Sequence, residues 1–291
     1  MNTHRIVTIL ATAALLIAIA AFALSLSARR QAGQAPEPGN SAPNIPADSD
    51  RVQSPAERAR MEQYVAQLQS EKHVLKTFDG SSGEIIDCVD VYNQPALKRQ
   101  GMEGHVIQFG PTTKPPEARE EQSLTRDQKL QVPNQLFTLT GQTCPDKSAP
   151  MTRLTMDTLK HFRTLEEFFQ KKYIDIRKPG GGGSGSAPHE YAHAARSVDN
   201  WGAESIFNVW SPYVEKSDEF SLSQMWVTRG GGGDLETVEG GWQVYRDLYG
   251  DWRAHLFIYF TPDNYGNGGC YNLSCNGFVQ VNNTVYIGGD F

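Results

Sequence analysis

Apolar and polar residues alternate on both sides of the glycine run at residues 230–233. A period of two is typical of strands with one apolar face, so the pattern predicts neighbouring strands at 219–227 and 236–244, joined by a turn through the glycines. In the second strand, Glu239 and Gly241 lie on the face opposite to Trp242. A glycine on that face lets another backbone or a substrate approach closely. The alternative is an ordinary solvated strand face, since glutamate is mostly an exposed residue.

The same half of the chain contains further short segments of strand-like composition. Each is bounded by turn-forming residues, and the segments lie at residues 203–210, 255–261 and 278–287. Such spacing is typical of an antiparallel sandwich or barrel. We therefore expect residues 189–291 to form an antiparallel β-sandwich domain.

The first half of the chain mixes helical and strand-like patterns. Ser54-Pro-Ala-Glu57 has the form of a capping box in front of an amphipathic run, which predicts a helix to about Lys76. Apolar residues at helical spacing predict a second helix at about 155–172. Strand-like pieces lie between the two helices, at residues 83–92 and 105–109. The pattern predicts a small α+β domain at residues 54–177, in a protein that is mainly β.

The N-terminus is typical of an exported protein. His4 and Arg5 precede an almost wholly apolar run at residues 6–26, so residues 1–30 are expected to be either a signal peptide or a signal anchor. Arg29 and Arg30 directly after the run favour an anchored form. The protein is therefore expected to be secreted, or held at a membrane through residues 6–26, with the remainder extracytoplasmic in both cases.

Two stretches have the composition of linkers. Residues 31–53 are rich in Pro, Ala, Asn, Gly and Ser, which predicts a disordered tether. Residues 178–188 consist mainly of glycine, serine and proline, and they mark the clearest boundary in the chain. A flexible segment of this kind is readily cut by proteases.

Composition narrows the classes of partner. The chain has 39% hydrophobic residues, enough for a packed core, and its net charge of -6 argues against nucleic acid, whose binders normally show a basic face. Four cysteines in an exported chain predict disulfides. Cys270 and Cys275 most simply close their own small loop, which leaves Cys88 to pair with Cys144. No cofactor is expected.

One short motif points to zinc. His189-Glu-Tyr-Ala-His193 fits the pattern in which two histidines one helical turn apart bind the metal and the glutamate activates a water molecule. The pattern requires a helix, and Pro188 with a glycine run precedes it here. A zinc metallopeptidase acting through His189, Glu190 and His193 is therefore the weaker alternative.

Several longer segments resemble the neprosin family. Asp87-Cys-Val-Asp-Val-Tyr-Asn-Gln-Pro-Ala96 is similar to the signature of its activation peptide. Similarity to the catalytic domain is carried by His189-Glu-Tyr-Ala192, Asn208-Val-Trp210, Glu219-Phe-Ser-Leu-Ser-Gln224, Glu239-Gly-Gly-Trp-Gln-Val244, Leu248-Tyr-Gly-Asp251 and Gly269-Cys-Tyr-Asn-Leu-Ser-Cys-Asn-Gly-Phe-Val-Gln280. The resemblance covers most of the chain after about Ser54.

The resemblance implies a secreted glutamic endopeptidase that cuts after proline, made as a zymogen with an N-terminal prodomain and a β-sandwich catalytic domain. It implies that Glu239 is one of two catalytic glutamates. Two carboxyl groups that face one water share a proton, so one acts as base and the other as acid, which suits acid pH. Trp226 and Trp242 are candidates to hold a proline ring, with sandwich core as the alternative, and Gln224 is a candidate carbonyl donor.

The sequence departs from the family pattern after the paired cysteines. The family's second catalytic glutamate lies in a Trp-Gly-Gly-Glu-like segment beyond that loop, and residues up to Phe291 contain no such segment. We therefore expect residues 189–291 to be the N-terminal part of the catalytic domain in a C-terminally truncated member. An alternative function is a non-catalytic extracytoplasmic β-sandwich that binds proline-containing peptides.

Overall fold

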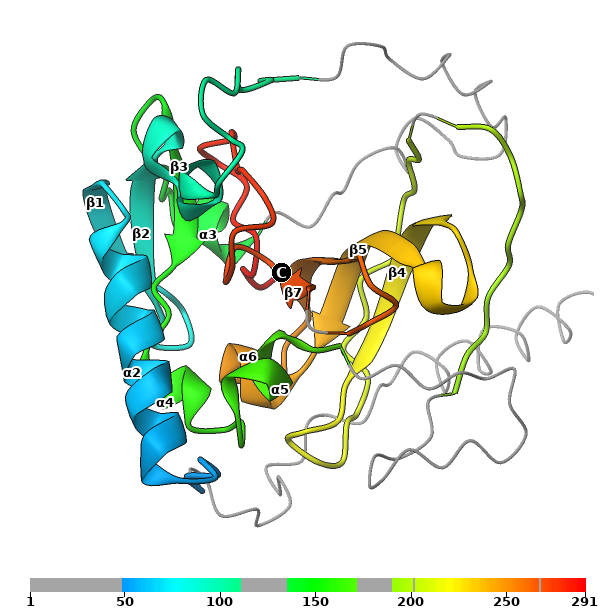
Figure 1. Cartoon of the computed structure of the whole chain (residues 1–291), viewed down its shortest axis with the longest axis horizontal. Coiled ribbons are helices and arrows are strands. Elements are labelled where there is room, and N and C mark those ends of the chain that lie inside the picture. Colours follow the sequence, from blue (N-terminus) through cyan, green and yellow to red (C-terminus); the bar gives the residue numbers. More distant parts are fainter. Residues whose placement is uncertain (1–48, 111–134, 172–189, 201, 267) are drawn as a thin grey trace, which may run out of the picture. The chain divides into compact units, whose positions relative to one another are not determined.

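Helix α2 (Pro55–Ser70) begins at the predicted capping box. Ser54 Oγ accepts a hydrogen bond of 3.2 Å from the backbone N–H of Glu57, and Pro55 occupies the first helical position. The helix ends at Ser70 rather than at Lys76, because the chain turns there into strand β1 (Val74–Asp79). The computed structural model describes residues 49–110, 135–171, 190–200, 202–266 and 268–291 (Figure 1).

The N-terminal half contains a three-stranded antiparallel sheet in the order β1-β2-β3 (Figure 1). Strand β2 (Ile85–Asp90) lies within the predicted strand at 83–92, whereas the segment at 105–109 forms no strand. Strand β3 (Ser148–Thr152) was not predicted, and it contains Pro150. The proline is accommodated because β3 is an edge strand.

The predicted helix at 155–172 is two short helices, α4 (Met156–Leu159) and α5 (Leu165–Phe169). A new N-cap divides them, because Thr164 Oγ1 accepts a hydrogen bond of 3.1 Å from the backbone N–H of Glu167. The apolar spacing was nevertheless correct, since both helices contribute to one core with α2. Its buried side chains include Met61, Leu68, Leu159, Phe162, Leu165 and Phe168.

The second half contains a four-stranded antiparallel sheet in the order β4-β5-β6-β7 (Figure 1). Its strands are β4 (Ser221–Arg229), β5 (Glu236–Val244), β6 (His255–Thr261) and β7 (Cys270–Tyr271). Short helical elements complete the described residues: α3 (Leu136–Leu139), α6 (Arg246–Tyr249), and the 3-10 turns η1 (Val91–Asn93), η2 (Pro95–Lys98) and η3 (Gly232–Asp234). The expectation of a mainly β protein with antiparallel sheets is confirmed.

Two of the strands predicted in the second half are absent. Residues 203–210 form no strand, and neither do residues 278–287. In the second segment, side-chain amides take the place of a neighbouring strand. Gln94 Nε2 donates to Gln280 O at 2.6 Å, and Gln94 Oε1 accepts from Gln280 N at 2.8 Å. Gln135 binds the N–H and C=O of Tyr286 in the same way, at 2.8 and 2.6 Å.

The two halves share their cores. Tyr286 packs with Ile86 and Phe137, and Tyr245 joins the core of α2, α4 and α5. Residues Asp48–Phe291 therefore form one compact unit. Within the described residues, no helix combines the length and apolar character needed to cross a bilayer. The predicted export segment at 1–30 and the glycine-rich linker at 178–188 lie outside the described residues.

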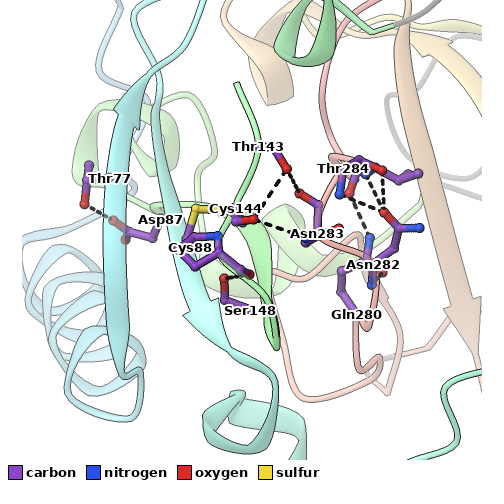
Figure 2. The surroundings of a disulfide bond; sticks show 12 residues. Thr77, Asp87, Cys88, Thr143, Cys144, Ser148, Gln280, Asn282, Asn283 and Thr284 are labelled. Atoms are coloured by element: carbon purple, nitrogen blue, oxygen red, sulfur yellow. Dashed lines mark hydrogen bonds between the residues drawn. A yellow bond between two sulfur atoms is a disulfide. The ribbon is translucent and has the colours of Figure 1, made fainter. Parts of the chain in front are cut away.

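Both disulfides pair the cysteines as expected, Cys88 with Cys144 and Cys270 with Cys275. Disulfides are consistent with an oxidising compartment. Hydrogen bonds beside the first disulfide join the two halves, as Figure 2 shows: Asn283 Nδ2 donates to Cys144 O at 3.2 Å, and Thr143 Oγ1 donates to Asn283 O at 3.3 Å. The backbone of Cys144 adds a further bond of 3.0 Å to Asn283 O.

The two disulfides should differ in their contribution to stability because they close loops of different length. Their sequence separations are 56 and 5 residues, for which loop-closure entropy predicts losses of about 4 and about 2 kcal/mol. We expect Cys88→Ala/Cys144→Ala to lower the free energy of unfolding about twice as much as Cys270→Ala/Cys275→Ala, measured by urea denaturation. An equal or larger loss for the short loop would contradict this.

Candidate active site

One face of the second sheet gathers the candidate residues. In the antiparallel register, Glu239 on β5 lies opposite Trp226 on β4 and Tyr259 on β6, so the three side chains point to the same face. Gln224 lies opposite Gly241 on that face. Glu239 is 2% exposed, so the alternative of a solvated strand face is wrong.

Gly241 is required by the close approach of two strands. A Cβ built at this position would lie 2.0 Å from Ser223 O on β4. Any larger residue would therefore separate β4 from β5 next to Glu239. The sequence suggested a close approach by a backbone or a substrate, and in this structure a neighbouring strand makes it.

Lys171 forms a buried ion pair with Glu239. It lies two positions after the end of α5, is 6% exposed, and its Nζ contacts Glu239 Oε2. The same ammonium group donates a hydrogen bond of 2.6 Å to Gln224 Oε1. Its backbone N–H donates to the Tyr259 hydroxyl at 3.0 Å, which fixes the segment over the sheet.

The second carboxylate oxygen of Glu239 is held by hydroxyl groups. Thr237 Oγ1 donates to Glu239 Oε1 at 2.8 Å, and the Tyr265 hydroxyl donates to the same oxygen at 2.6 Å. Hydrogen bonds to an ionised acceptor are stronger than those between neutral groups. Both oxygens of this buried carboxylate are therefore satisfied, one by an ammonium group and the other by two hydroxyls.

The electrostatics of the site follow from burial. Desolvation lowers the pKa of Lys171, and the adjacent Glu239 opposes that shift. The ammonium also lies over the rings of Phe257 and Tyr259, 5.2 and 5.7 Å from their centroids. Burial raises the pKa of Tyr265, and the negative charge of Glu239 raises it further, so its hydroxyl remains a proton donor.

The two tryptophans lie in different environments. Trp226 shares the face of Glu239, next to the rings of Tyr191 at 6.0 Å and His193 at 6.5 Å. Its indole Nε1 is buried without a hydrogen-bond partner in the described part of the chain. Trp242 points to the opposite face, where it packs in a hydrophobic cluster and donates to Asn208 O at 2.7 Å. The structure therefore brings Trp226 and Gln224 to Glu239, whereas Trp242 belongs to a core.

The zinc motif has no helix through its described residues. His189 lies outside them, and Glu190 and His193 are exposed in a segment without helix or strand. Two histidines four positions apart bind one metal ion only when a helix places them on the same face. Among the residues that the structure describes, no three His, Cys, Asp or Glu side chains are grouped as metal ligands.

Sequence reasoning missed three residues of the site: Lys171, Thr237 and Tyr265. Thr237 could have been found, because it lies two positions before Glu239 and a strand places it on the same face. Lys171 gave no signal, since a lysine after an amphipathic helix is normally solvated. Tyr265 lies in a turn whose conformation the pattern does not specify.

Comparison with protein families gives two matches. Residues 77–195 match the Neprosin activation peptide, and residues 217–291 match Neprosin. Lys171 lies in the first match and Glu239 in the second. The ion pair at the centre of the site therefore joins the two regions.

Removing one member of the buried pair should destabilise the chain more than removing both. We expect Glu239→Gln or Lys171→Met alone to lower the free energy of unfolding by about 3–5 kcal/mol at neutral pH, because each leaves a buried charge without its partner. The double variant should recover much of that loss. Urea denaturation measures all three, with exposed Glu236→Gln on the same strand as control. Additive losses would show that the two groups are not coupled.

Proposed function

This chain belongs to the neprosin family, and from that we propose that it is the zymogen of a glutamic-type endopeptidase, acting at acid pH on proline-containing peptides and cutting after proline. Family membership suggests a peptidase zymogen. The proline preference, the glutamic mechanism and the role of Glu239 are parts of this proposal. Trp226 and Gln224 are its substrate-binding candidates.

The observation that carries the proposal is the ion pair between Lys171 and Glu239. A carboxylate buried in the middle of a sheet is costly, and here its counter-charge comes from the segment that matches the activation peptide. While Lys171 remains in place, its ammonium group blocks Glu239 Oε2 from water and substrate. Removal of the segment would free that oxygen. This arrangement supports a latent precursor whose reactive group is held closed by its own activation segment.

A falling pH should weaken the closed state through Lys171. Because burial lowers its pKa in the folded chain, the unfolded chain binds more protons between the folded and unfolded pKa values, and stability falls as pH falls through that window.

After release, Glu239 would act as one member of a carboxyl pair. We propose that ionised Glu239 takes a proton from the attacking water through Oε2, while a second, protonated carboxyl group polarises the peptide carbonyl and then protonates the leaving nitrogen. In the described residues the hydrogen-bond partners of Glu239 are Lys171, Thr237 and Tyr265, with no second carboxyl among them.

That absence, limited to the described residues, favours a second candidate function. Without a second carboxyl group, the same face could bind proline-containing peptides and not hydrolyse them. Trp226 supports both functions equally. Its ring lies on the face of Glu239, and its indole N–H has no hydrogen-bond partner within the described residues. Turnover distinguishes the two functions.

Acid incubation of the full chain with a proline-containing reporter peptide tests the proposal. We expect shedding of the activation segment, seen as a loss of mass, and cleavage after proline. Glu239→Gln should abolish both, with a loss of activity of at least about a thousandfold, because it removes the base. Glu236→Gln is the matched control and should cut normally. Reporter binding without cleavage by the wild type would instead support the binding function.

The role of Lys171 has its own test. Burial lowers the pKa of Lys171 from its ordinary value of 10.5, so the wild type loses stability as pH falls below that value, whereas Lys171→Met lacks this group. The difference in the free energy of unfolding between wild type and Lys171→Met should therefore narrow as pH falls through that range. Thermal melts across the range measure this, with intact mass confirmed after each melt. Lys216→Met, at an exposed surface pair, is the control. A stability difference between wild type and Lys171→Met that does not change with pH would contradict the proposed role of the ion pair in keeping the site closed.

A further inference from the structure

The loop between β6 and β7 holds two consecutive residues in a strained conformation. Asn264 and Tyr265 have φ angles of 56° and 60°, in the left-handed region that costs a non-glycine residue roughly 1–2 kcal/mol. Side-chain oxygens fix the loop in this form. Thr261 Oγ1 accepts a hydrogen bond of 2.8 Å from the backbone N–H of Tyr265, and Asp263 Oδ1 accepts one of 3.1 Å from that of Gly266.

The consequence of this conformation is the position of the Tyr265 side chain. Its ring stacks on Tyr259, with 6.0 Å between centroids and 10° between planes. Its hydroxyl lies 2.6 Å from Glu239 Oε1. Strain in a turn is retained when the surrounding contacts determine it, and here those contacts aim one hydroxyl group at one carboxylate oxygen.

Tyr265 and Lys171 differ in what happens to them on activation. Lys171 lies in the region matching the activation peptide, whereas Tyr265 and Thr237 lie in the region matching Neprosin. Removal of the activation segment would therefore take the ammonium group from Oε2 and leave both hydroxyl donors on Oε1. The two oxygens of Glu239 become chemically different at that moment.

We propose that Tyr265 is a positioning residue: together with Thr237 it occupies Glu239 Oε1, so that Oε2 is the oxygen that takes the proton from water. This inference rests on the proposed peptidase function. Two donors on one oxygen fix the rotation of the carboxylate, and they leave Oε2 as the oxygen that can act as general base.

The other groups around Glu239 agree with this assignment. The titratable side chains that act on it come from three elements: Lys171 from the segment after α5, Tyr259 from β6 and Tyr265 from the loop. Asp263 in the same loop acts on Tyr259. Burial raises the pKa of both tyrosines, so neither loses its proton in the acid range and Tyr265 stays a donor there. Lys171 leaves with its segment.

The kinetic test compares Tyr265→Phe with Tyr249→Phe in the full chain after acid activation. Tyr249 is buried in the same half of the molecule, and its hydroxyl contacts Gln243 and Asn272 instead of Glu239. We expect Tyr265→Phe to lower kcat by about tenfold to a hundredfold with little change in KM, since it removes a hydrogen bond to a charged group. The acid limb of its kcat/KM profile should move to higher pH. Tyr249→Phe should show neither effect.

A second measurement does not depend on turnover. Carboxyl-labelled glutamate NMR follows the side-chain carboxyl carbon of Glu239 in the Lys171→Met background, with the signal identified by its loss in Glu239→Gln. Tyr265→Phe should change the chemical shift of this carbon, because it removes a hydrogen-bond donor from Oε1, and Tyr249→Phe should not. A shift in a chain that cuts no reporter supports the hydrogen bond and refutes the peptidase function. An unchanged signal, or normal kcat with an unchanged profile, overturns the role of Tyr265.

Discussion

The buried ion pair between Lys171 and Glu239 constrains much of the rest of the structure. A carboxylate in the middle of a sheet, away from water, is tolerated only when both oxygens have partners. The ammonium group satisfies one oxygen, and the hydroxyls of Thr237 and Tyr265 satisfy the other. Lys171 reaches this position because α5 is anchored through Leu165 and Phe168 in the core built around α2. The packing of the first half thus determines which charged group lies beside Glu239 in the second half.

The two halves also complete each other's hydrogen bonding. Residues 278–287 form no strand, and their backbone groups are bound instead by the side-chain amides of Gln94 and Gln135. Both glutamines lie in the region that matches the activation peptide. Buried backbone groups need hydrogen-bond partners. If this region were lost, the backbone groups of residues 278–287 that Gln94 and Gln135 now bind would need other partners. The region that matches the activation peptide therefore supports the fold of the second half of this chain as well as covering its candidate site.

Local patterns predicted the elements whose stability is local. The bounds predicted for β5 and β6 match the structure, since the two-residue period and the flanking turns are sufficient to define them. The capping box placed the start of α2 correctly for the same reason. The cysteine pairing followed from spacing. The errors had two causes. Thr164 caps a new helix inside the predicted one, a local signal that the apolar spacing does not contain. Strand β3 contains a proline that only an edge strand accepts, and its edge position is decided by the pairing of distant strands.

The sequence alone identified the family, the sheet face that contains Glu239, and Gln224 and Trp226 as residues near it, because all three are encoded over short distances along the chain. It assigned Trp242 to the same role, although the strand period places that residue on the other face. Only the tertiary structure showed that Lys171, 68 positions away, neutralises Glu239, and that a strained turn brings in Tyr265. Those contacts depend on how separate elements pack, and no period or motif along the chain specifies that packing.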